Sequence, residues 1–435
     1  MKIKNKRYQK VLIGFSIIFL YFLIGAYTSN QYCASQINHR KHIHITNPYE
    51  GVDWQAVNHV KTALHTHTAN SGIFRDEPGP DSGGTLPDDF IKAYEKAGFG
   101  ALVLTDHDYI GYPWDGTTLE PPLDSEHAPP SFVNSPNSSL LTVPGNELSK
   151  HTHLLSYGTM YRDDVGSGFE ENIVNVAGAP NVFDGTGGII YLAHPRRNNA
   201  SEDRRNEPLG GKQFSDAWWA DLVLRHDHIK GMEVLNAGRF SRNHSERLWD
   251  AMLTQTMPER NIFGIATDDN HNSTSFKPTS KLGGGYTYML LHDHEMTNYG
   301  LWNALSSGVM YFSTHKVVNH IDGPNDDKKP RPNTPPPKID AIDVDHDKGT
   351  ITVTANYTSK IDWISGVNAD NTASRVVYSK LNNADLTGTS AELFTTVFDV
   401  RSLFDMSGER ASYVRFRLFG HGGQTHAQAF GLNVE

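Results

Sequence analysis

The segment Leu64-His65-Thr66-His67-Thr68 begins a series of five motifs, each of which follows a short apolar run and carries histidine or carboxylate groups. The other four are Thr105-Asp106-His107, Glu147 with His151 and His153, Ala193-His194-Pro195, and Thr267-Asp268-Asp269-Asn270-His271. Imidazole and carboxylate are ligands that suit zinc, iron and manganese. One His-x-His pair arises easily by chance, but five motifs in one context predict a centre for several metal ions.

The apolar runs before the motifs predict buried strands. Residues 101–104 form a short continuous apolar run, as expected of a strand that is buried on both faces. Similar runs occupy residues 140–143, 189–193, 232–235 and 262–266. A helix is predicted at 87–97, where Pro87 opens the pattern and Gly98 closes it. This alternation of strands and helices is typical of βα units.

Polar groups follow the predicted strands at the points where the strands end. Metal-binding groups at the C-terminal ends of consecutive parallel strands are the layout of an α/β barrel, whose active site lies on that rim. Asp and Asn at such positions also serve as helix N-caps and turn residues. Histidine is a poor cap, so its recurrence favours a metal site over capping.

The composition indicates a folded chain with more than one domain. Its 435 residues are 37% hydrophobic and 20% charged, as in an ordinary globular protein. We expect a catalytic domain at 51–320, a stiff Pro-rich linker at 321–338 and a small β-sandwich at 339–435. The formal net charge of −10, without a long basic stripe, argues against nucleic acid as a partner. Cys33 is the only cysteine, which excludes an intrachain disulfide and a thiolate zinc site.

The N-terminal sequence predicts export. Residues 1–10 form a basic region that is expected in the cytoplasm, and residues 11–27 are an uncharged run with the character of a signal anchor or a signal peptide. Residues 28–50 are polar and form a tether. We therefore expect the protein to contact the membrane through this segment and to face the extracytoplasmic side, or to be secreted or periplasmic if the segment is cleaved.

The expected site suits hydrolysis of a phosphoric ester. Two histidines separated by one residue at a strand end point the same way and reach one ion. A carboxylate such as Glu147 can bridge two ions. Two ions on the order of 4 Å apart activate a water molecule and neutralise charge on the leaving oxygen, as a phosphoester requires.

On these residues the chain resembles the polymerase-and-histidinol-phosphatase (PHP) superfamily of metal-dependent phosphoesterases. The resemblance covers roughly residues 50–315, and the motifs follow in the family order. The matching segments are ALHTHTANS at 63–71, FGALVLTDHD at 99–108, VPGNE at 143–147, HLLSYG at 153–158, GGIIYLAHP at 187–195, GMEVLNA at 231–237 and GIATDDNH at 264–271.

The resemblance implies a distorted (β/α)7 TIM-like barrel with a trinuclear site for two to three divalent ions of zinc, manganese or iron. The implied ligands are His65, His67, Glu147 and Asp269 for the first metal, Glu147, His153 and His194 for the second, and His107 and His271 for the third. His153 is preferred to His151 because residues 154–158 match the family's continuation. The implied catalytic carboxylates are Glu147, Asp269 and Asp268, of which Asp268 orients a ligand.

The chain departs from the family pattern after the first motif. Residues 72–84 are longer than usual, rich in Pro and Gly, and without histidine. Two alternatives remain for the third site: a carboxylate from Asp76 or Asp81 completes it, or the site is weak or empty.

Three further residues are candidates for substrate contact. Arg196 and Arg197 follow His194 closely, and guanidinium groups suit phosphate, although a solvated loop is the alternative. Asn236 ends another predicted strand and is expected to line the pocket, whereas Glu233 is expected to be structural.

We expect an extracytoplasmic, metal-dependent phosphoesterase that hydrolyses a small organic phosphate through a metal-activated hydroxide. One alternative is a hydrolase of amides or carbamates at the same site, because hydroxide also attacks a carbonyl carbon. Another is a non-catalytic metal-binding module at the cell surface, and the complete set of ligands weighs against it.

Overall fold

The structure is a computed structural model that describes residues 43–68, 71, 85, 87–110, 138–150, 152–163, 167–195, 215–236, 244–271, 282–315, 334–366, 374–404 and 411–434. Several predicted features lie outside these residues, namely the segments 1–10 and 11–27, most of 28–50 and of 321–338, His151, Asp76, Asp81, Arg196 and Arg197. Ile45–Asn433 form one compact unit. Among the described residues, no helix has the length and apolar character needed to cross a membrane.

One sheet has five strands in the order β4 (Gly145–Leu148), β5 (Leu154–Tyr157), β6 (Ile189–Leu192), β7 (Ile229–Asn236) and β8 (Phe263–Thr267). β6, β7 and β8 are parallel, whereas β5 runs antiparallel to β4 and to β6. Only residues 149–153 separate β4 from β5. Because that connection is too short for a parallel crossover, the two strands form a hairpin.

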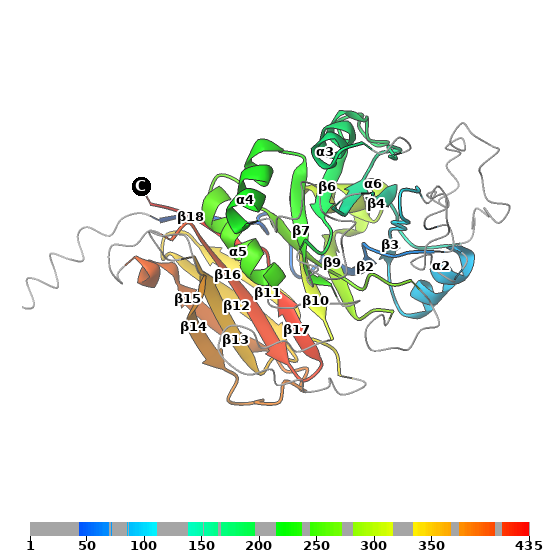
Figure 1. The fold of residues 1–435 in the computed structure, drawn as a ribbon. Coiled ribbons are helices and arrows are strands. Elements are labelled where there is room, and N and C mark those ends of the chain that lie inside the picture. The colour runs from blue at the N-terminus through cyan, green and yellow to red at the C-terminus, as the bar shows by residue number, and fades with distance from the viewer. Residues whose placement is uncertain are drawn as a thin grey trace, which may run out of the picture. The chain divides into compact units, whose positions relative to one another are not determined.

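Three helices pack against this sheet: α3 (Phe169–Gly178), α4 (Asp216–Arg225) and α5 (His244–Thr256) (Figure 1). Their shared core with the strands includes Val176, Trp219, Trp249, Ile190 and Met232. Ser215 is the N-cap of α4, and its hydroxyl oxygen accepts a hydrogen bond from Trp218 N at 3.1 Å.

A larger sheet runs through both halves of the chain. Its strands include β2 (Asn58–Ala63), β3 (Ala101–Leu102), β9 (Gly285–Leu291), β10 (Met310–Thr314), β13 (Lys360–Ser365), β14 (Arg375–Leu381), β16 (Tyr413–Gly420), β17 (Gly423–His426) and β18 (Phe430–Val434). β2 and β3 are parallel, and β9, β10 and β17 follow in antiparallel pairings. Phe312 of β10 lies opposite His426 of β17, so this sheet continues directly into the C-terminal part.

Two further helices cover parts of the larger sheet. α2 (Pro87–Lys96) agrees with the helix predicted at 87–97 and buries Phe90 and Tyr94 beside β2 and β3. α6 (Asn298–Ser307) lies between β9 and β10 in the chain and buries Leu301 and Leu305 in the core below them. Gly308 is its C-cap, and the left-handed φ of 78° suits a residue without a side chain.

The C-terminal third is made of strands whose burial alternates. β11 (Lys338–Asp345), β12 (Thr350–Asn356) and β15 (Phe394–Asp399) form a three-stranded sheet. Along β12, Ile351 and Val353 are buried while their neighbours are partly exposed, as the sequence alternation predicts. Trp363 of β13 stacks on Phe398 of β15 with ring centroids 4.6 Å apart, so the small sheet packs face to face on the end of the larger one.

The predicted fold, a distorted (β/α)7 TIM-like barrel with a separate small β-sandwich, is wrong. The described strands form open and mostly mixed or antiparallel sheets, and no barrel closes among them. The β4–β5 hairpin reverses a strand that the barrel requires to be parallel, and β17 occupies the edge of β10. Apolar runs indicate burial but not strand direction, which explains the error. The domain boundaries at 320 and 338 remain predictions.

Candidate metal centre

The five sequence motifs meet where the two larger sheets approach each other. Thr66 forms an isolated parallel bridge with Asn270, and His107 forms one with Glu147. His67 N donates a hydrogen bond to Asn270 O at 2.8 Å. Backbone contacts therefore hold the segments after β2, β3 and β8 together with β4.

Strand direction explains why these residues share one rim. The predicted ligands follow β2, β3, β6 and β8 or lie within β4, with His153 as the exception. His153 precedes β5, but β5 is antiparallel to β6, so its first residue lies at the rim where β6 ends. Asp269 and His194 both have left-handed backbones, with φ of 45° and 27°. Non-glycine residues seldom adopt this conformation, and it is concentrated at functional sites.

The first donor group consists of His65, His67, Glu147 and Asp269. The two Nε2 atoms of the histidines lie 3.0 Å apart. Glu147 Oε2 is 3.4 Å from each of them, and Asp269 Oδ1 is 3.5 Å from His65 Nε2 and 3.3 Å from His67 Nε2. Ligands at about 2.0 Å from a tetrahedral ion are separated by about 3.3 Å. The spacing of this group therefore fits one tetrahedral metal ion.

The second donor group consists of Glu147, His153 and His194. Glu147 Oε1 lies 2.7 Å from His153 Nδ1 and 3.0 Å from His194 Nε2. Glu147 Oε2 faces the other way, toward the first donor group and toward His107 Nδ1 at 2.9 Å. The two oxygens of one buried carboxylate therefore face two different sets of imidazoles, which is the geometry of a bridging ligand.

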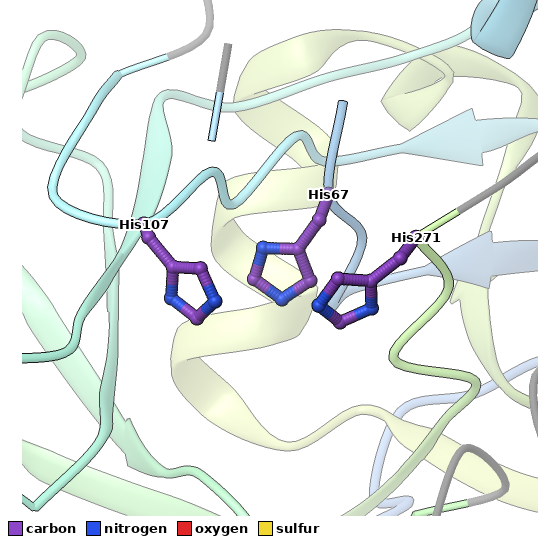
Figure 2. A group of neighbouring side chains, drawn as sticks. All are labelled: His67, His107 and His271. Atoms are coloured by element: carbon purple, nitrogen blue, oxygen red, sulfur yellow. The ribbon is translucent and has the colours of Figure 1, made fainter. Parts of the chain in front are cut away.

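The third donor group consists of His67, His107 and His271. Figure 2 shows the three imidazoles side by side with His67 in the middle. The ring of His67 lies 4.3 Å from that of His107 and 4.2 Å from that of His271. His107 and His271 are thus brought together as predicted, and His67 joins them. Within the described residues, this group includes no carboxylate.

The charges of the cluster keep Glu147, Asp269 and His67 in the states that bind cations, whereas the burial of His65 is outweighed by Glu233, Glu147 and Asp269, which raise its pKa well above the ordinary value. Burial raises the pKa of Glu147, but His153, His65 and His107 outweigh this effect and hold the pKa well below its ordinary value. The pKa of Asp269 is likewise low, because nearby histidines overcome its burial. Burial and the neighbouring histidines lower the pKa of His67 well below its ordinary value. Ionised carboxylates and a neutral imidazole are the forms that ligate a metal.

One buried oxygen in the cluster has no hydrogen bond. Glu147 Oε2 is fully enclosed and makes none with any described residue, although three imidazole nitrogens lie within 3.4 Å of it. A buried carboxylate oxygen without a partner is costly. Imidazole nitrogens and carboxylate oxygens are ligands of zinc, manganese and iron. The donor groups therefore fit divalent metal ions, and a cation between them would compensate this oxygen.

Two other predicted site residues lie beside the donor groups. Asp268 faces away from them: its Oδ2 accepts hydrogen bonds from Tyr94 Oη and from Gly283 N, both at 2.8 Å. Burial raises the pKa of Asp268 to about 7. Asn236 Nδ2 lies 3.3 Å from Asp269 Oδ2, so its amide contacts a carboxylate of the first donor group.

The structure also reveals two supporting residues, Ser71 and Glu233, whose contacts the motifs did not indicate. Ser71 Oγ lies 3.1 Å from His67 Nδ1 and accepts a hydrogen bond from His107 N at 2.9 Å. Glu233 Oε1 lies 2.7 Å from His65 Nδ1. A carboxylate or hydroxyl on the second nitrogen of a ligating histidine fixes its ring. In the sequence, the only indication of a role for Glu233 at the site is its position near the end of an apolar strand.

Few known proteins are similar to this chain. No family model matches the chain, and no curated protein sequence matches it. Among solved structures, a chain from Bacteroides vulgatus is similar, described as a two-domain protein containing a predicted PHP-like metal-dependent phosphoesterase. It is 14% identical, with a TM-score of 0.40 over 87% of this chain and 96% of that one. A likeness at this level carries no argument for fold or function, which depend here on the site itself.

Proposed function

We propose that the chain is a metal-dependent phosphoesterase that hydrolyses a small organic phosphate. The observation that carries this proposal is the position of Glu147, whose two oxygens face separate imidazole sets. The histidines on either side of this carboxylate would hold divalent ions, which would lower the pKa of water and neutralise charge on phosphate oxygens.

The histidines of the three donor groups differ in their solvent exposure. His65 and His67 are fully buried, whereas the side chains of His153 and His194 are 10% and 11% exposed and that of His271 is 32% exposed. The buried pair anchors the site, and the more exposed histidines mark the side from which a substrate arrives. Glu147 and Asp269 would supply the negative charge that retains cations at this site.

Metal dependence is the first prediction. The double variant His65→Ala/His67→Ala removes two of the four ligands of the first donor group, so it should lose bound metal and hydrolytic activity. The matched control is His292→Ala/His294→Ala, another His-x-His pair, which belongs to none of the donor groups. Metal content of the purified full chain measures the outcome, and full stoichiometry in the first variant would refute the ligand assignment.

The substrate class is tested with the same preparation. We expect turnover of phosphomonoesters or phosphodiesters, which chelation abolishes and Mn²⁺, Zn²⁺ or Fe²⁺ restores. Turnover of amides or carbamates alone would favour that class of hydrolase. Metal binding without turnover of any of these substrates would favour a non-catalytic metal-binding module.

Export is proposed from the sequence of residues 1–27, with the membrane as the partner of this segment. The cations before the apolar run favour translocation of everything that follows. A reporter enzyme fused after residue 435 should therefore be active only in an extracytoplasmic compartment. A reporter that works only in the cytoplasm would exclude the proposed location and leave the chemistry of the site unaffected.

A further inference from the structure

Glu233 is a buried carboxylate that belongs to none of the three donor groups. It lies near the end of β7, and its side chain is 0% exposed. Its Oε1 contacts His65 Nδ1 at 2.7 Å, and its Oε2 accepts a hydrogen bond from His194 N at 2.6 Å. The two oxygens thus reach one residue from the first donor group and one from the second.

The contact with His65 determines which nitrogen of that ring can bind a metal. With Nδ1 facing a carboxylate, the neutral ring carries its proton on Nδ1 and leaves the lone pair on Nε2. His65 Nε2 is the atom that faces His67, Glu147 and Asp269. A carboxylate behind a ligating histidine also makes that ligand more basic. Thr267 Oγ1 donates a hydrogen bond to the same oxygen of Glu233 and fixes its position.

Glu233 contacts His194 through the backbone N–H of that residue and not through its ring. His194 has a φ of 27°, a conformation that non-glycine residues seldom adopt. Its imidazole faces Glu147 Oε1 at 3.0 Å with the backbone in this conformation. The hydrogen bond from His194 N to Glu233 therefore holds the second donor group in its observed geometry. Asn236 extends the link, because its amide donates to Glu233 Oε2 at 3.1 Å and to Asp269 Oδ2 at 3.3 Å.

We infer that Glu233 is a positioning residue that couples the first and second donor groups, so that binding of metal at both depends on its carboxylate. This inference deepens the proposed function and rests on its premise that divalent ions bind here. Glu147 joins the same two groups through direct ligation, whereas Glu233 acts through the ring orientation of His65 and the backbone of His194. Its charge also offsets part of the charge that two divalent ions bring into a buried site.

The test is a titration of the metal-free, full-length protein with Co²⁺, whose visible absorption reports tetrahedral coordination. Glu233→Gln keeps the shape and removes the charge, and we expect the affinities of the two tightest sites to fall together, each roughly 10- to 100-fold. The absorption of the first site should also change. The control, Glu246→Gln, removes another buried carboxylate, which contacts Arg415 and none of the donor groups, and it should leave both affinities unchanged.

Each result has a defined meaning. Loss of affinity at one site only, or at neither, would overturn the coupling. A lower melting temperature of the metal-free protein with unchanged affinities would show that Glu233 merely supports the fold. If Glu233→Gln does not fold, Thr267→Val removes one hydrogen bond to Glu233 and should weaken both sites by a smaller factor. A wild type that binds two Co²⁺ but hydrolyses no phosphate would refute the proposed function and leave this inference intact.

Discussion

A single carboxylate, Glu147, links the first and second donor groups at the level of individual atoms. Its side chain is 1% exposed, and five imidazoles lie around its two oxygens. Replacing it changes the charge and the separation of both metal positions at once. Among the described residues, Glu233 also contacts both groups with its two side-chain oxygens, but its contact with the second group is to the backbone N–H of His194.

Glu147→Gln should therefore lower kcat by several orders of magnitude, because the amide retains the shape but cannot neutralise two cations. The fold should survive, since apolar burial holds the strands. His271→Ala is the comparison. His271 belongs only to the third donor group, so its replacement should lower kcat less than Glu147→Gln does. Kinetics of both variants at saturating metal measure the difference. A near-normal kcat in Glu147→Gln would remove the bridging role and the two-metal mechanism.

The sequence predicted which residues lie together at the site. It did not predict which neighbouring side chains hold these residues in position. His65, His67, His107, Glu147, His153, His194, Asp269 and His271 all lie together, because each motif carries its own signal at a strand end. Glu233 carries only a weaker signal, its position near the end of an apolar strand without a histidine beside it. It lies 168 residues from His65 in the chain, and an apolar strand with one Glu is equally consistent with a structural role. A contact of this kind depends on the tertiary fold.

At the scale of elements, most predicted strands are present and β6, β7 and β8 are parallel as expected, whereas the antiparallel strands β5, β9, β10 and β17 were not predicted. β6, β7 and β8 coincide with the runs at 189–193, 232–235 and 262–266. Residues 140–143 form no strand, and only Leu141 makes an isolated bridge, to Ala101. Burial follows from apolar composition, but pairing direction depends on connection length and on which edge is vacant. The sequence predicted no strand at 154–157, so the short connection 149–153 is evident only in the structure.

A buried ion network joins α5 to strands of the C-terminal part. Arg415 donates to Asp250 Oδ1 at 2.6 Å and to Glu246 Oε1 at 2.9 Å. Arg417 donates to Glu246 Oε1 at 3.1 Å and to Asp362 Oδ2 at 3.1 Å. All five side chains are at most 2% exposed. Removing one member of such a network leaves buried charge without compensation.

Glu246→Gln should therefore lower the free energy of unfolding by about 3–5 kcal/mol at neutral pH. Burial raises the pKa of Glu246, but Arg417 and Arg415 outweigh it, and the pKa lies below its ordinary value of 4.5. A lowered pKa stabilises the fold above pH 4.5, and this contribution is lost as the pH falls below that value. The difference between wild type and variant should thus shrink between pH 7 and pH 3 in denaturant titrations.

The control for this network is Glu170→Gln. Glu170 pairs with Arg225 at 2.6 Å, but its side chain is 44% exposed, so water already solvates both charges. Its replacement should cost only about 0–1 kcal/mol. Equal losses in the two variants, or a difference that is constant with pH, would show that the buried network contributes no special stability.

At the scale of the whole molecule, the C-terminal part contributes to the core of the metal-binding part. β17 pairs with β10 along Phe312, Ser313 and Thr314. Tyr413 and Ala429 lie in the same buried cluster as Trp249 of α5. The compositional change at the linker predicted two domains with a boundary near 320–338. Composition along a chain does not reveal that strands from both sides share one sheet.

A chain truncated to residues 51–320 should therefore fail to fold as a stable monomer. Its β10 would present an open edge to other chains, and Glu246 and Asp250 would lose both arginines. Removal of residues 1–42 is the matched control, because that deletion lies before β1 (Ile43–Thr46) and spares these contacts. Size-exclusion chromatography and thermal denaturation of both forms measure the outcome. A cooperative, monomeric 51–320 fragment with full metal content would show that the sheet continuity is dispensable, because the metal centre would then be built and held by its own part of the chain.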